Sequence, residues 1–204
     1  IGAAQIDFGL RKIVERYQLD AVTVKCFDLL PVFQNTGCYA IARLNEEGIP
    51  AGCESDVLSC VGMLLLKNLV NLSSFMANPV MIDLERGVML AAHCTIARDM
   101  TESYVLRSHL ESNLGIGIQG HVEQGPATVF RIGGRDLKEV FVTNAAILEG
   151  KTQKNMCRTQ LKVKIPLSSN PRTIITNPLG NHHLLVVGDW EERIKKYLSE
   201  FVVQ

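Results

Sequence analysis

The sequence predicts an α/β segment with parallel strands, followed by an antiparallel all-β module that closes with a helix. Three observations predict this fold class. Residues 1–75 alternate between helical and strand patterns, short apolar runs separated by turn residues follow from about Asn78, and residues 190–201 form an amphipathic helix. We expect two tightly joined domains, residues 1–77 and 78–204.

The first domain alternates between helices and strands. Helices are expected where apolar residues recur at three- and four-residue spacing, and strands where β-branched residues run together. The order of these elements predicts parallel strands joined by right-handed crossovers. In chain order they are a helix over Ile6–Tyr17, a strand over Ala21–Cys26, a helix over Tyr39–Glu47 ended by Gly48 and Pro50, an extended piece over Ile49–Cys53, and a buried helix over Asp56–Leu69.

The second domain has many short strands. Apolar runs at such regular intervals, with turn residues between them, are typical of an antiparallel barrel or a sandwich. A final helix over Trp190–Phe201 is expected because Asp189 can cap it and Glu192 stands at capping-box distance. The expected strands are Val80–Ile82, Val88–Ala92, Tyr104–Leu106, Ala127–Ile132, Val140–Thr143, Leu161–Ile165, Thr173–Ile175 and Leu184–Val187.

The charge balance and apolar content exclude several classes of protein. The 204 residues contain 21 Lys and Arg against 21 Asp and Glu, so no basic excess favours nucleic-acid binding. The chain is 47% hydrophobic, too apolar for a disordered protein. Its longest apolar run, Val57–Leu66, is shorter than the roughly 20 residues of a membrane-spanning helix, so we expect no membrane partner.

Cysteine usage and the first residue give two further expectations. The six cysteines include no C-x-x-C pair, so we expect reduced thiols in a cytoplasmic protein. The chain begins with Ile1 rather than Met. We therefore expect it to be the C-terminal part of a longer protein.

Three positions could carry metal chemistry. Glu54 lies where an expected strand runs into a helix, the place where α/β proteins gather ligands, although Glu54 or Asp56 could instead cap that helix. His93 ends an apolar strand, and His182 and His183 open another, where only one of the two can face a given site. One glutamate with two histidines is a ligand set that suits Mn, Fe or Zn.

Four motifs in order resemble the L-fucose isomerase and L-arabinose isomerase superfamily. They are Gly48–Val57 with its C-E-x-D stretch, Ser74–Asn78, Ala92–Cys94 and Gly180–His183. The resemblance covers nearly the whole chain. It implies that the first domain is the end of a flavodoxin-like (Rossmann-like) middle domain and that the second is the family's C-terminal β-barrel. It also implies a homo-oligomer, a trimer or hexamer.

The resemblance further implies a metal-dependent aldose–ketose isomerase that acts on a small sugar with Mn²⁺ or another divalent metal. Protons would move between C1 and C2 through an enediolate. Glu54 would be a metal ligand and the catalytic base, His93 a further ligand, and His183 the C-terminal ligand with His182 as the fallback. The candidate substrate-binding residues are Asp56, Asn181 and His182.

The chain departs from the family at one position. Ala77 and Asn78 stand where the family has a second acidic ligand, and Asn78 is the candidate catalytic residue there. An amide oxygen can ligate a metal but cannot take a proton as a carboxylate does. The alternatives are therefore a non-catalytic sugar-binding relative with a degraded metal site, or a structural module.

Overall fold

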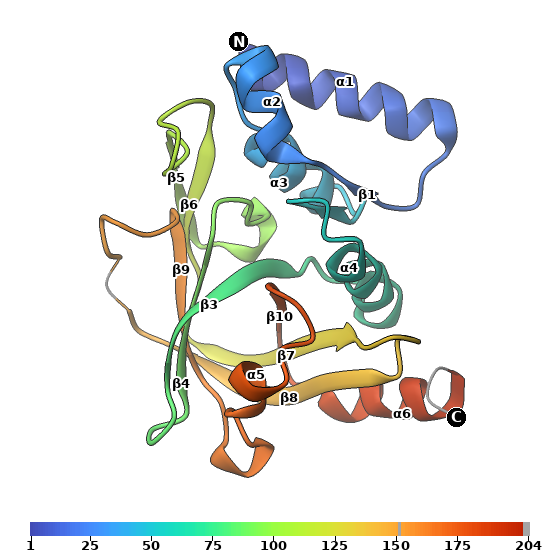
Figure 1. The fold of residues 1–204 in the computed structure, drawn as a ribbon, viewed down its shortest axis with the longest axis vertical. Coiled ribbons are helices and arrows are strands. Elements are labelled where there is room, and N and C mark those ends of the chain that lie inside the picture. The colour runs from blue at the N-terminus through green and yellow to red at the C-terminus, as the bar shows by residue number, and fades with distance from the viewer. Residues whose placement is uncertain (151, 202–204) are drawn as a thin grey trace.

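Six antiparallel strands close into a barrel in the order β10-β3-β4-β9-β8-β7 (Figure 1). The computed structural model describes residues 1–150 and 152–201, so residues 151 and 202–204 of the expected second domain lie outside the described residues. The closed order confirms the antiparallel barrel and excludes the sandwich. The strands are β3 (Phe75–Asp83), β4 (Val88–His93), β7 (Gly125–Gly133), β8 (Glu139–Leu148), β9 (Thr159–Lys164) and β10 (His183–Val187).

Helices and a small parallel sheet precede the barrel. The three expected helices are present, and β1 pairs with β2 in parallel. The strand expected over Ala21–Cys26 is shorter, because β2 offers only two residues to pair with it, and the chain then turns into the unpredicted helix α2. The elements are α1 (Gly2–Tyr17), β1 (Val22–Thr23), α2 (Cys26–Phe33), α3 (Cys38–Glu46), β2 (Ala51–Gly52) and α4 (Val57–Val70).

Two expected strands of the second domain differ in the structure. Residues Tyr104–Leu106 lie in β5 (Ser103–Arg107), which leaves the barrel and pairs with the unpredicted strand β6 (Gly117–His121). The strand expected over Thr173–Ile175 is wrong. These residues form the short helix α5 (Thr173–Thr176), because the N–H groups of the residues after Pro171 bond to carbonyls three or four positions back. Local turn bonds here outweigh the strand propensity of Ile and Thr.

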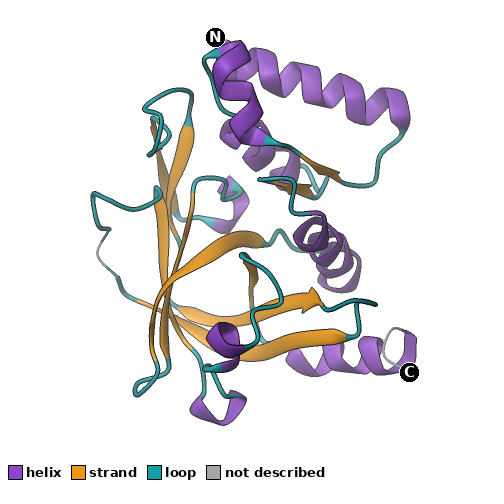
Figure 2. Ribbon diagram, in the orientation of Figure 1, coloured by secondary structure: helices purple, strands orange, loops and turns teal. Residues whose placement is uncertain are grey.

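The apolar core has two layers, because successive side chains of a strand point to opposite faces of the barrel wall. In β10, Leu185 packs in one cluster and Leu184 and Val186 in the other. The second cluster also contains Leu66 of α4 and Ile194 of α6 (Glu191–Phe201), so it lies between the helices and the outer wall of the barrel. The first cluster therefore fills the barrel interior. Figure 2 shows α4 and α6 beside the strands that they cover.

The strand β3 joins the two expected domains, since it begins at Phe75 and the proposed boundary at residues 77 and 78 falls inside it. The final helix is tied to the barrel through Asn144 of β8, whose Oδ1 accepts the backbone N–H of Glu191 at 3.1 Å. In the part of the chain that the structure describes, no helix is both long and apolar enough to cross a membrane.

Candidate metal centre

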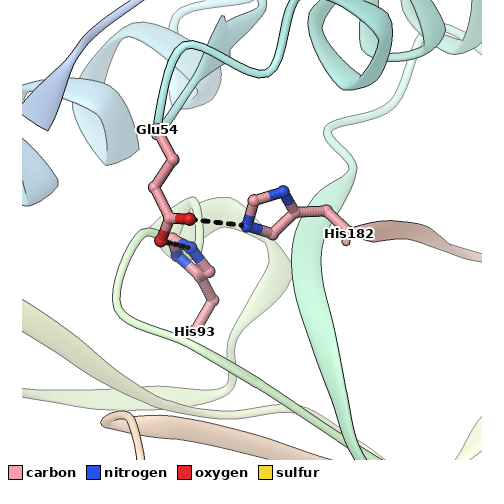
Figure 3. Close-up of side chains that lie close together, drawn as sticks. All are labelled: Glu54, His93 and His182. Carbon is pink, nitrogen blue, oxygen red and sulfur yellow. Dashed lines mark ion pairs between the residues drawn. The ribbon is translucent and has the colours of Figure 1, made fainter. Parts of the chain in front are cut away.

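The residues that the sequence singled out come together beside strand β3 of the barrel. The strand β4 ends at His93, and β10 begins at His183. The register places His183 opposite Ala77 of β3 and Ala92 opposite Asn78, so His93 and His183 flank the same part of β3, which we call the rim of the site. The residues between β2 and α4, which include Glu54, descend onto this rim from the helical part of the chain (Figure 3).

Glu54 faces two histidines across this rim. Its Oε1 lies 3.5 Å from Nε2 of His93, and its Oε2 lies 3.5 Å from Nε2 of His182. Within the described residues, these three are the group of His, Cys, Asp and Glu side chains whose ligand atoms converge, all within 4.8 Å of one another. Glu54 and Ser55 both have left-handed backbone, with φ of 56° and 55°. Such strained backbone in non-glycine residues often occurs at functional sites.

The Nδ1 atom of each histidine contacts a side chain on the side away from Glu54. Nδ1 of His182 donates to Oδ2 of Asp56 at 2.9 Å, and Nδ1 of His93 lies 3.0 Å from Oγ1 of Thr95. These contacts direct both Nε2 atoms toward Glu54. Metal-binding histidines are usually oriented in this way by a partner at the second ring nitrogen. The Nε2 atom of His182 is buried and has no hydrogen-bond partner among the described residues, so it is available to a cation.

Asp56 connects the rim to helix α4. Its carboxylate accepts the backbone N–H of Ser59 at 2.9 Å and the Ser59 hydroxyl at 2.8 Å, which caps α4 as expected of a residue before a helix. The same carboxylate forms an ion pair with Arg131 of β7 at 3.0 Å. Arg131 is 3% exposed and also bonds to Ser59 and to the carbonyl of Leu179. Asp56 is therefore a positioning residue that fixes the orientation of His182.

The charges of the cluster favour cation binding. The contact with His182, and then that with His93, holds the pKa of the Glu54 carboxyl well below its usual range, so this side chain is ionised at neutral pH. Burial lowers the pKa of His93, which keeps its ring neutral with a free lone pair. For His182, burial lowers the pKa, but the bond to Asp56 and the contact with Glu54 outweigh it and the pKa is raised. A proton or a metal ion at this Nε2 would be stabilised in the same way.

A glycine permits Arg131 to reach this position. Gly180 has φ of 155°, and a Cβ there would overlap the Arg131 guanidinium. We expect Gly180→Ala to displace Arg131 and to lower the free energy of unfolding by about 1–3 kcal/mol, as overpacking does. Gly125 is a matched control, because its φ is 157° and a Cβ there meets nothing within 4 Å. Denaturant unfolding of both variants measures the effect, and equal losses would contradict the role of Gly180.

The other predicted residues lie around this cluster. His183, expected as a ligand, is not in the converging group; it packs against Phe141, which belongs to the interior cluster. Ala77 pairs with His183, so the next residue of β3, Asn78, faces the outside of the barrel. Asn181 is exposed and lines a cavity of about 370 Å³ together with Glu54, Asp56, Arg131 and His182.

The sequence reasoning missed two residues that support the site. Arg131 stands alone as a charge in the apolar run Ala127–Ile132, which is a usable signal because a buried charge needs a partner. Thr95 follows His93 by two residues, and nothing in the sequence distinguishes it from a solvent-facing threonine. The partner of Arg131 lies 75 positions away in the chain, so the pairing requires the fold.

The protein is therefore a closed antiparallel barrel with a candidate divalent-metal centre, formed by two histidines and one glutamate. Its curated relatives are sugar isomerases by name. A sulfoquinovose isomerase from Clostridium sp. (strain MSTE9) is 26% identical over 195 residues, 86% of this chain and 41% of that protein. Sulfoquinovose isomerases from Priestia aryabhattai and Priestia megaterium (strain ATCC 12872 / QMB1551) are each 24% identical over 136 residues, 63% of this chain and 30% of theirs.

The chain thus spans well under half the length of these relatives. No family model matches it. The similarity makes the chain a relative of sugar isomerases.

Proposed function

We propose that this chain forms the metal-binding part of an aldose–ketose isomerase that acts on a small sugar. The observation that carries the proposal is the convergence of Glu54, His93 and His182, each histidine oriented from behind by a fixed partner. The similarity to proteins named sulfoquinovose isomerase supports the same reaction class.

The residues fit a manganese-type ion. Two neutral imidazole nitrogens and one carboxylate form a donor set that Mn²⁺, Fe²⁺ or Zn²⁺ accepts. The buried Nε2 of His182 has no hydrogen-bond partner among the described residues and lies 3.5 Å from Oε2 of Glu54, an arrangement that a cation between the two atoms would satisfy. Glu54, His93 and His182 would hold the ion. When bound, the metal supplies Lewis-acid polarisation of the sugar carbonyl.

The protein's own groups would position the sugar and move its proton. Glu54 is ionised and therefore able to take a proton from the carbon next to the carbonyl and to return it to the neighbouring carbon. Asp56 and Arg131 would keep His182 fixed while this happens, and Asn181, at the edge of the cavity, offers its amide to a sugar hydroxyl. Asn78 has no proton-accepting group, so Glu54 carries the transfer in this scheme.

The proposal extends to the rest of the family resemblance. The parallel pairing of β1 with β2 supports a flavodoxin-like domain that ends at β2 and α4, and the family resemblance supports an oligomer in which neighbouring copies complete the cavity. Sulfoquinovose is the first substrate to test, because the relatives carry that name.

The test is a substrate panel with the metal-loaded protein. The protein, freed of metal and then loaded with Mn²⁺, is incubated with sulfoquinovose, pentoses and 6-deoxyhexoses, and ketose formation is followed by NMR. We expect one aldose to be converted and chelation to stop the reaction. Mn²⁺ binding without conversion of any sugar would favour a sugar-binding relative, and the absence of both would overturn the proposal.

The two adjacent histidines give a sharper prediction. We expect His182→Gln to weaken Mn²⁺ binding by more than the roughly 10- to 100-fold typical of losing an outer partner, because a ligand itself is removed. His183→Gln should leave the Mn²⁺ affinity nearly unchanged, since His183 faces Phe141. Isothermal titration calorimetry measures both affinities, with circular dichroism as the check on folding. The reverse order of effects would show that the ligand is His183.

A further inference from the structure

A pair of thiols, Cys26 and Cys53, lies next to Glu54, since Cys53 is the residue before it. The sulfur atoms of Cys26 and Cys53 are 3.0 Å apart, and both residues are buried, with 7% and 2% exposure. Both are free cysteines. Their segments are held side by side because Thr23 of β1 pairs with Gly52 of β2, the residue before Cys53. Cys53 in turn precedes Glu54.

We propose that Cys26 and Cys53 form an oxidation-sensitive dithiol whose disulfide weakens metal binding at Glu54. A disulfide has a length of about 2.05 Å, so the two sulfurs need to approach by about 1 Å. The oxidant is a peroxide such as H₂O₂. The first thiol attacks it, the O–O bond breaks, and one water leaves as a sulfenic acid forms. The second thiol displaces the hydroxyl as a second water, so two thiols lose two electrons and two protons.

The backbone connects this bond to the metal centre. The Cys53 carbonyl accepts the N–H of Asp56 at 3.1 Å, and the N–H of Ser55 donates to the Val24 carbonyl at 3.2 Å. Cys53 is therefore part of the same tight turn that holds Glu54 in its left-handed conformation. The two sulfur atoms approach by about 1 Å, and the part of this movement that the Cys53 backbone takes up displaces Glu54, the next residue. Site residues need to be held to about 0.5 Å, so even a part of this movement disturbs the Glu54 carboxylate between the histidines.

The effect on metal binding rests on the proposed function, but formation of the disulfide does not. The metal-free protein is treated with H₂O₂, digested without reduction and mapped by mass spectrometry, and its Mn²⁺ affinity is measured before oxidation, after it, and after dithiothreitol. We expect a Cys26–Cys53 disulfide and an Mn²⁺ affinity that falls at least tenfold and recovers on reduction.

Two variants separate this pair from the other cysteines. Cys26→Ser should bind Mn²⁺ normally and lose its sensitivity to peroxide. Cys60→Ser, which removes a buried cysteine whose sulfur bonds to the backbone carbonyls of Val22 and Pro50, should stay as sensitive as the parent protein. The proposed dithiol would be wrong if Cys26 and Cys53 stayed reduced. It would also be wrong if the peroxide formed a disulfide only between Cys94 and Cys157, whose thiols also contact each other.

A Cys26–Cys53 disulfide with unchanged Mn²⁺ affinity would overturn the link to the metal centre. If the untreated protein binds no Mn²⁺, the proposed function fails, and the disulfide map, which needs no metal, still decides whether the dithiol exists.

Discussion

Replacing Glu54 with glutamine is expected to abolish isomerase activity while the protein remains folded. The substitution removes the negative charge that faces His93 and His182, and with it the group that we propose as the base. General acid–base catalysis contributes about 10²–10⁴-fold, so the loss in kcat/KM should reach at least about 10³-fold. Glu54 is partly exposed and caps no helix, so the melting temperature should change little.

Two measurements and one control variant test the role of Glu54. Ketose formation and Mn²⁺ titration test the two roles, and both should fail together. Glu102→Gln is the matched control, because Glu102 is an exposed carboxylate beside His121 and lies outside the converging group. Turnover that survives in Glu54→Gln would assign the proton transfer to another residue.

The barrel was predictable from the sequence because its strands are short apolar runs separated by turn residues at regular intervals. Val88–Ala92 and Leu184–Val187 are continuous apolar runs, and in β10 this agrees with a strand whose two faces pack in different core clusters. The helix α5 was not predictable in this way, since its four residues include no polar periodicity and its turn is fixed by Asn170 and Pro171 just before it.

The candidate site was predictable only in part. Glu54 and His93 stood out by their positions at element ends, but the choice between His182 and His183 depended on where β10 begins. His182 lies before the strand, in the bend after Gly180 and Asn181, so it is not bound by strand alternation and can turn toward Glu54. Sequence patterns place a strand's first residue to within a few positions, and here a single position decides which histidine faces Glu54.

Arg131→Met is expected to destabilise the protein strongly and to weaken metal binding. It leaves Asp56 partly buried without its cationic partner, and breaking a buried ion pair by removing one member costs about 3–5 kcal/mol. Loss of the partner also frees the carboxylate that orients His182, so Mn²⁺ affinity should fall by about 10- to 100-fold. Denaturant unfolding and Mn²⁺ titration measure the two effects.

Two comparisons show whether the ion pair causes these effects. Arg11→Met removes a partly exposed arginine paired with Asp7 and Glu47, and such surface pairs contribute about 0–1 kcal/mol. The double variant Asp56→Asn/Arg131→Met leaves no unpaired charge, so it should be more stable than the sum of the single losses predicts. It should not recover Mn²⁺ affinity, because a neutral amide at position 56 fixes the His182 ring less firmly than a carboxylate does. Additive losses in stability would mean that Arg131 acts by packing against Gly180 and Leu179 rather than through the charge of Asp56.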